Sequence, residues 1–155
     1  MMTAEPLVWP SHGWSELHRV MLSGWGDKWP DVPSVYRLVM LEDENAPSMK
    51  PASIPRWFGP DETGTLYLGM AKSLYGRLGA LVNAVHPDQR GGKHHLHILR
   101  DEEPYRTKVP AAKLAIAWLA AGSKKPDALE DELVKAYVMR FGEAPPLNRA
   151  GGINK

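Results

Sequence analysis

The alternation of apolar and polar positions divides most of this chain into strands and helices. Short runs rich in β-branched, aromatic and aliphatic residues predict three strands, at about 34–41, 65–70 and 113–119. In the third run, large residues alternate with alanines, which favours a buried strand, although the alanine content would also suit a helix. Two further stretches repeat apolar residues every three or four positions, and this spacing predicts helices over 73–85 and about 127–141.

A tryptophan-rich leader occupies residues 1–33, before the first predicted strand. Between Ser11 and Ser23 its apolar residues follow helical spacing, and Gly24 suits a helix end, so we expect a short helix there. Its tryptophans either pack on the core or stack on nucleobases, and we favour packing because large aromatic side chains usually fill cores. They are Trp9, Trp14, Trp25 and Trp29. We expect the leader to pack on the domain that follows, and residues 149–155 to form a loose tail.

Two segments without a regular period separate the predicted elements. Residues 42–64 are rich in proline and glycine and form a long excursion between two strands, which is more typical of a functional loop than of a simple connection. Local packing within it would present Arg56 to nucleic acid. Residues 86–108 include the most basic part of the chain, and they suit either a path for phosphates or a solvated connection. Their candidate nucleic-acid contacts are Arg90, Lys93 and His94.

Composition narrows the class of protein. Of the 155 residues, 43% are hydrophobic and 24% are charged, which is ordinary for one globular domain. The net charge is +1, so any nucleic-acid binding must come from local clusters of lysine and arginine. No apolar run is long enough to span a membrane, and the N-terminus lacks a signal pattern, so we expect no membrane partner. The lack of cysteine excludes disulfides and thiolate zinc sites and fits a cytoplasmic protein.

The most informative stretch is 65–78, where a predicted strand runs almost directly into a predicted helix. Tyr67 lies near the end of the strand, and Ser73 can cap the helix. Arg77 then lies about one turn into the helix, beside its buried stripe. A phenol and a guanidinium would line one corner next to a helix N-terminus, where anions are favoured. This corner could hold a phosphate.

Several segments taken together resemble one enzyme family. Residues 34–36, Ser-Val-Tyr, and 67–69, Tyr-Leu-Gly, resemble the paired tripeptides of the GIY-YIG nuclease family. The second tripeptide continues through 70–78 as the family's strand-to-helix segment does, with an arginine in the helix. Farther on, 129–134 resembles its glutamate helix, and 141–148 resembles its terminal segment ending in asparagine. The resemblance covers about residues 34–148 and keeps these landmarks in order.

The resemblance implies a fold and an activity. The fold is α+β and sandwich-like, with a small antiparallel sheet of three strands flanked by helices. The implied activity is that of a metal-dependent endonuclease, which hydrolyses phosphodiester bonds in DNA with Mg²⁺ or Mn²⁺ as cofactor. The implied catalytic residues are Tyr36, Tyr67, Arg77, Glu130 and Asn148.

Within that set, the resemblance makes Glu130 the single metal ligand. Glu132 is the alternative, but Glu130 stands three residues before an apolar pair, as the family glutamate does. The chain departs from the family at Met70, where a basic residue often follows the glycine, and at Leu81, where some members carry a histidine. Lys72 could substitute for the lost basic residue, as could a histidine such as His86 or His94, and we also expect Lys72 to contact nucleic acid.

The residue types make chemical sense for phosphodiester hydrolysis. A lone carboxylate suits hydrated Mg²⁺, and a guanidinium is a natural bidentate partner for a phosphate. A phenol has an ordinary pKa of about 10, so it acts as a base only beside a cation, or else it orients the water. Which tyrosine does so stays open. Two other functions also stay open: a nucleic-acid-binding module of the same fold that turns over weakly, and a protein-interaction module that uses the leader. A protein partner could supply specificity.

Overall fold

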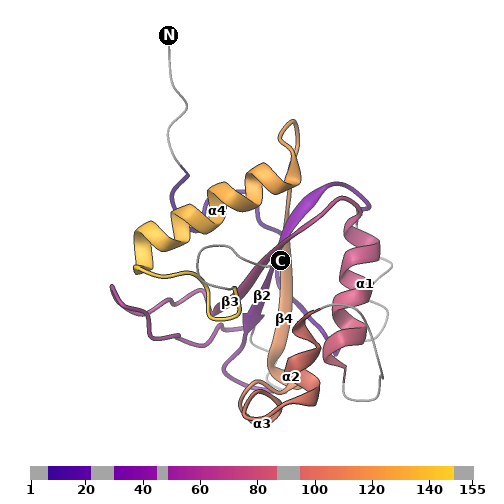
Figure 1. Ribbon diagram of the computed structural model, residues 1–155, viewed down its shortest axis with the longest axis vertical. Helices are drawn as coiled ribbons and strands as arrows, with labels where there is room; N and C mark the ends of the chain where they lie inside the picture. Colours follow the sequence, from indigo (N-terminus) through magenta and orange to yellow (C-terminus); the bar gives the residue numbers. More distant parts are fainter. Residues whose placement is uncertain (1–6, 22–29, 45–48, 87–94, 149–155) are drawn as a thin grey trace.

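The core of the fold is one open sheet of four antiparallel strands. The computed structural model describes residues 7–21, 30–44, 49–86 and 95–148. The strand order is β1-β4-β2-β3, so β3 forms one edge and β1 the other. The strands are β1 (His18–Arg19), β2 (Ser34–Met40), β3 (Thr65–Ala71) and β4 (Leu114–Ala120) (Figure 1). The three predicted strands are each confirmed to within one residue, whereas the expectation of a three-stranded sheet was wrong.

The fourth strand lies in the leader, where we had expected a helix. The backbone of this segment pairs with β4, because Ser15 N donates to Trp118 O at 2.8 Å and Val20 N donates to Leu114 O at 2.9 Å. Amides that pair with a neighbouring strand cannot also form the hydrogen bonds of a helix. The helix prediction for Ser11 onward was therefore wrong over the described residues, and its expected end at Ser23 lies outside them.

Two long helices cover opposite faces of the sheet (Figure 1). They are α1 (Leu74–Val85) and α4 (Pro126–Phe141), and both confirm the helical spacing of the sequence. Successive residues of a strand point to opposite faces, and the packing follows that rule. Tyr36 and Tyr67 pack in the cluster under α1, whereas their neighbours Val35 and Leu68 pack in the cluster under α4. The sheet is thus buried on both sides.

Each long helix ends where its sequence predicts. Ser73 precedes α1, and its side chain accepts a hydrogen bond from Gly76 N at 3.4 Å, so the predicted N-cap is confirmed. Gly142 ends α4 in the left-handed conformation with φ at 81°, as a glycine C-cap commonly does. Between α1 and β4 the described residues, 95–113, form short helical pieces: η2 (His95–His97), α2 (Ile98–Asp101), α3 (Tyr105–Lys108) and η3 (Ala111–Lys113).

Two tryptophans of the leader pack on the face that α4 covers. Trp9 is only 2% exposed, and its ring meets that of Tyr137 edge-on with centroids 5.0 Å apart. Trp14 lies 6.2 Å from Trp9 and stacks on the guanidinium of Arg37 at 5.1 Å. These contacts support packing for both tryptophans. Trp25 and Trp29 lie outside the described residues, and so does the tail 149–155. Among the described helices, none has the length and apolar character needed to cross a membrane.

Candidate active site

A pocket of about 580 Å³ opens where β3 passes into α1. Its wall combines three elements, with Tyr67 from β3, Arg77 from α1 and Glu130 from α4. Helix α1 and helix α4 cover opposite faces, so their side chains can meet only past the open edge of β3. The pocket therefore lies at this edge. Lys72 and Ser73, which directly follow β3, line its rim.

The two tyrosines of the resemblance lie side by side under α1. Tyr36 on β2 pairs in register with Gly69 on β3, and the ring centroids of Tyr36 and Tyr67 are 6.1 Å apart. Tyr36 is fully buried, whereas Tyr67 is 4% exposed and lines the pocket. Of the two phenols, Tyr67 is thus the one that a ligand in the pocket can reach.

Arg77 links the two phenols to the pocket. Its guanidinium hydrogen-bonds both Tyr36 and Tyr67, and Tyr36 also hydrogen-bonds Tyr67. The net pKa of Tyr67 is nevertheless raised to about 12, because burial and, next in size, the nearby charge of Glu130 outweigh the opposing effect of Arg77. Burial raises the pKa of Tyr36 still more. Both phenols therefore keep their protons at neutral pH.

Glu130 reaches the pocket over the edge of β3. Its carboxylate accepts a hydrogen bond from the backbone N–H of Met70, an amide on the outer edge of the sheet. Partial burial raises the pKa of Glu130 above its ordinary value, while the Met70 hydrogen bond and the charge of Arg77 pull it down. Glu132 points elsewhere, because its carboxylate binds the ammonium of Lys124 at 2.6 Å. The geometry favours Glu130 over Glu132 as the pocket carboxylate.

Asn148 binds the backbone of the residue after Tyr67 but does not line the pocket. Its side chain is buried and forms two hydrogen bonds with the backbone of Leu68, accepting from N at 2.9 Å and donating to O at 2.9 Å. Leu147 N donates to Leu66 O at 2.8 Å, so this short segment pairs with the edge of β3. Asn148 thus holds the strand that carries Tyr67.

The two departures from the family pattern have different settings. Leu81 is fully buried, packs in the core under α1 and does not line the pocket. Met70, in contrast, lines the pocket where the family often has a basic residue. Lys72 lies two positions along on the same rim and is exposed. It supplies a cation to the pocket beside that of Arg77.

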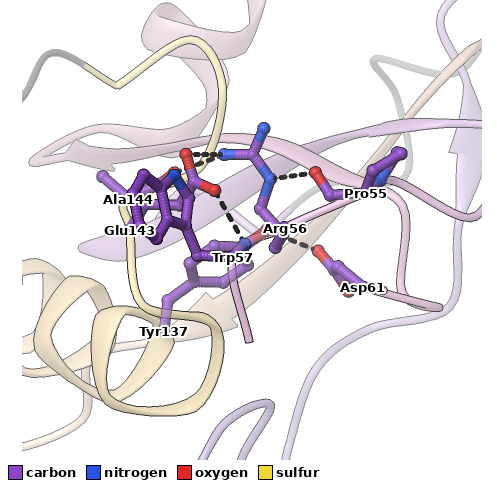
Figure 2. A network of polar contacts seen from close by, with 7 residues as sticks. All are labelled: Pro55, Arg56, Trp57, Asp61, Tyr137, Glu143 and Ala144. Carbon is purple, nitrogen blue, oxygen red and sulfur yellow. Dashed lines mark hydrogen bonds and ion pairs between the residues drawn. The ribbon is translucent and has the colours of Figure 1, made fainter. Parts of the chain in front are cut away.

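Arg56 lies outside the pocket, in a polar network that ties the 42–64 loop to the end of α4 (Figure 2). Its guanidinium donates to Pro55 O at 2.8 Å and to Ala144 O at 3.0 Å, and forms an ion pair with Glu143 at 3.1 Å. The loop thus holds Arg56 down and presents Trp57, which is 82% exposed. A contact between Arg56 and nucleic acid stays a prediction, and the structure gives this side chain a packing role.

The remaining basic candidates cannot be placed. Arg90, Lys93 and His94 lie outside the described residues. His97 is described, and its Nδ1 atom lies 3.4 Å from a carboxylate oxygen of Asp101. In the described ranges, no group of three or more histidine, aspartate or glutamate side chains is arranged to hold a metal ion.

The donor set of the pocket fits a hydrated divalent cation better than a caged one. Glu130 offers one carboxylate, of which one hydrogen-bond position is taken by the Met70 amide. Mg²⁺ suits such a site, because it keeps several waters and often binds through one or two carboxylates together with substrate phosphates. Glu130 is thus the residue that would hold Mg²⁺ or Mn²⁺, with the wall at Tyr67 beside it.

One residue of this region escaped the sequence analysis. Asp31, three positions before β2, accepts hydrogen bonds from the Ser73 hydroxyl at 2.7 Å and from Tyr75 N at 3.3 Å. The pairing of β2 with β3 brings Asp31 to this place, and that register is visible only in the sheet. A lone aspartate after a proline carries no signal of its own in the sequence.

The resemblance to a nuclease family rests on the residues quoted above and has no independent support. No family model matches the chain significantly, and no curated protein or solved structure does either.

Proposed function

We propose that this protein is a metal-dependent endonuclease that hydrolyses phosphodiester bonds, with DNA as the expected substrate. The observation that carries the proposal is the meeting of Tyr67, Arg77 and Glu130 at one pocket, from three elements and across more than sixty positions of sequence. A phenol, a guanidinium and a carboxylate together can bind a phosphate, orient a water and hold a cation.

Arg77 and Lys72 would bind the substrate phosphate. The guanidinium presents two parallel N–H groups that match two phosphate oxygens, and the ammonium adds a second positive charge at the rim. Arg77 is fixed by its hydrogen bonds to the two phenols, so its fork is oriented before a ligand arrives. Charge that develops on the phosphate during attack would be stabilised by the same groups.

Tyr67 would position the attacking water. Its pKa of about 12 keeps the hydroxyl protonated at neutral pH, so it orients a water by hydrogen bonding and does not remove its proton unaided. Tyr36 is buried behind it and acts as a positioning residue through Tyr67 and Arg77. A divalent cation bound at Glu130 would act as a Lewis acid on the phosphate and acidify a coordinated water.

A cleavage assay tests the proposal. Supercoiled plasmid and a panel of single-stranded, double-stranded, branched and flap oligonucleotides would be incubated with Mg²⁺, with Mn²⁺, and with EDTA. We expect metal-dependent cleavage of at least one substrate, loss of cleavage in EDTA, and loss in Glu130→Gln. The matched control is Glu132→Gln, whose carboxylate pairs with Lys124 instead. Equal cleavage by Glu130→Gln and wild type would refute this site.

One observation favours a second candidate, a nucleic-acid-binding module of weak turnover. Met70 places an apolar side chain in the pocket wall where the family often has a cation. Such a module would still bind nucleic acid, with an affinity that falls steeply with salt, but would not cut it. A mobility-shift assay across salt concentrations, run beside the cleavage panel, separates the two. In the described part of the leader, Trp9 is buried and Trp14 is partly buried, so these two tryptophans do not favour a protein-interaction module.

A further inference from the structure

An acidic side chain lies against the pocket that the proposed function assigns to a phosphate. The pairing of Ser34 with Ala71 places the chain before β2 beside the chain after β3. Asp31 therefore meets the start of α1, where its Oδ1 atom accepts from Ser73 Oγ at 2.7 Å and from Tyr75 N at 3.3 Å. Ser73 itself lines the pocket, so an anionic oxygen lies within one hydrogen bond of the pocket wall.

The surroundings of this carboxylate would also attract a phosphate. Helix α1 has twelve residues and no acidic residue of its own in the first turn. Its N-terminal amides carry partial positive charge. Lys72 and Arg77 add two positive charges on the pocket wall, against the one carboxylate of Glu130. Asp31 thus occupies an anion position at the start of α1, one hydrogen bond away from a pocket wall that carries two cations.

The backbone under Asp31 is fixed although its side chain is exposed. Pro33 O accepts a hydrogen bond from Ala121 N at 2.9 Å, and the Ser34 hydroxyl donates to Val32 O at 3.0 Å. A ligand that takes the Tyr75 amide can therefore displace the carboxylate by rotation about its side-chain bonds, with the strand left in place.

We propose that Asp31 is a competing anion, which the phosphate of the substrate displaces from the start of α1. The inference rests on the proposed function for the identity of that substrate. Its carboxylate lowers the affinity of the pocket for phosphate in two ways, by occupying the Tyr75 amide and by repelling negative charge. Asp31 thereby sets the affinity threshold that a nucleic acid must exceed to enter the site.

The test is a titration of inorganic phosphate into metal-free protein, followed by the amide NMR signals of Tyr75 and Gly76. Wild type is compared with Asp31→Asn, which keeps an oxygen acceptor for Ser73 and loses the charge. We expect the variant to bind phosphate about three to ten times more tightly at low salt, with the gain shrinking as ionic strength rises. A duplex oligonucleotide in EDTA should show the same gain.

The matched control is Asp43→Asn, which changes the net charge equally. Asp43 is exposed and lies past the other end of β2, and a seven-residue strand spans roughly 23 Å. Equal phosphate affinity in wild type and Asp31→Asn, an equal gain in Asp43→Asn, or no phosphate response at Tyr75 in either protein would each overturn the inference. If Asp31→Asn binds phosphate more tightly than wild type, but wild type does not cut DNA with Mg²⁺, only the proposed nuclease activity is refuted.

Discussion

Gly69 and Tyr36 face each other across β3 and β2 so closely that a side chain at position 69 has no room. A Cβ atom on Gly69 would lie 2.6 Å from the hydroxyl oxygen of Tyr36 and 2.7 Å from a ring carbon of Tyr67. Such distances are far inside van der Waals contact. The glycine of this tripeptide thus lets the two phenols approach each other, and Arg77 joins them there.

We therefore expect Gly69→Ala to disturb the site as well as the fold. Tyr36 is fully buried, so its ring has no open space into which to move. Overpacking of this kind costs about 1–3 kcal/mol of unfolding free energy, and we expect most cleavage to be lost with the phenol geometry. Chemical denaturation and the cleavage assay measure both effects.

Gly79→Ala is the matched control for that variant. A Cβ atom on Gly79, which lies in α1, would meet nothing within 4 Å. Alanine is the better helix former by up to about 1 kcal/mol, so this variant should be as stable as wild type or more so. If Gly69→Ala proves as stable and active as Gly79→Ala, the close approach of the two phenols is not what position 69 requires.

Asn148 offers a prediction about stability. Asn148→Ala removes both hydrogen bonds to Leu68 and leaves two backbone groups of the edge strand without their partners. We expect a loss of about 2–3 kcal/mol in unfolding free energy, because unsatisfied buried polar groups are costly. Asn148→Asp should also destabilise, since a carboxylate cannot donate to Leu68 O. Asn83→Ala, on the exposed side of α1, serves as the control and should change little.

The elements that periodicity describes were predictable from the sequence, and the leader shows where periodicity fails. Four of its apolar residues share helical spacing, yet they serve different contacts in the structure. Trp14 joins the cluster under α4, Leu17 packs on a third cluster, and Val20 enters the core under α1. Met21 is 40% exposed. Spacing alone cannot separate one helical face from three independent contacts of an extended chain.

The candidate site shows the same division. Residues beside a recognisable strand-to-helix turn, Tyr67 and Arg77, can be placed from the sequence, because the turn fixes their separation. The contact of Asn148 with Leu68 spans eighty positions, and no local pattern encodes it. The partners of Arg56 and of Asp31 could not be predicted for the same reason, since only the folded chain brings them near.

The raised pKa of Tyr67 predicts that the stability of the protein depends on pH in the alkaline range. Its pKa is raised to about 12 in the folded protein, against about 10 in an unfolded chain. Folding thus favours the neutral phenol, so this contribution to stability is complete below pH 10 and is lost as the pH rises towards 12. Phenylalanine cannot ionise, so the unfolding free energy of Tyr67→Phe should rise by up to about 2 kcal/mol relative to that of wild type over that pH window. Parallel stability curves for the two proteins from pH 8 to 12 would contradict the assignment.

A lysine at position 77 would separate the effect of the positive charge from that of the planar guanidinium. Arg77→Lys keeps one positive charge in the pocket but loses the planar fork that binds the phenols and would bind a phosphate. We expect cleavage to fall by at least tenfold while the affinity for DNA in EDTA changes much less. Lys72→Arg is the control for a basic substitution on the same rim, and it should keep most activity. Full activity in Arg77→Lys, at unchanged stability, would assign Arg77 to general electrostatics.

We expect the substitution Glu130→Gln to abolish activity and at the same time to increase stability. Partial burial raises the pKa of its carboxyl in the folded protein, so folding favours the protonated form. The stabilisation from that form is complete below the unfolded pKa of about 4.3 and is lost as the pH rises, which means that the ionised carboxylate opposes folding at pH 7. Glu130→Gln has no charge to bury, and it should abolish metal-dependent cleavage.

At pH 7 we expect Glu130→Gln to raise the unfolding free energy by up to about 1 kcal/mol, a bound kept low because a partly exposed carboxylate is screened by water. The gain should fade as the pH falls and the wild-type carboxyl takes up its proton. Glu132→Gln, which loses only an exposed ion pair with Lys124, should show neither effect. Thermal and denaturant unfolding from pH 4 to 8, beside the cleavage assay, measure both variants. If Glu130→Gln is inactive but less stable than wild type at pH 7, the carboxylate supports the fold, and the loss of cleavage no longer identifies a metal ligand.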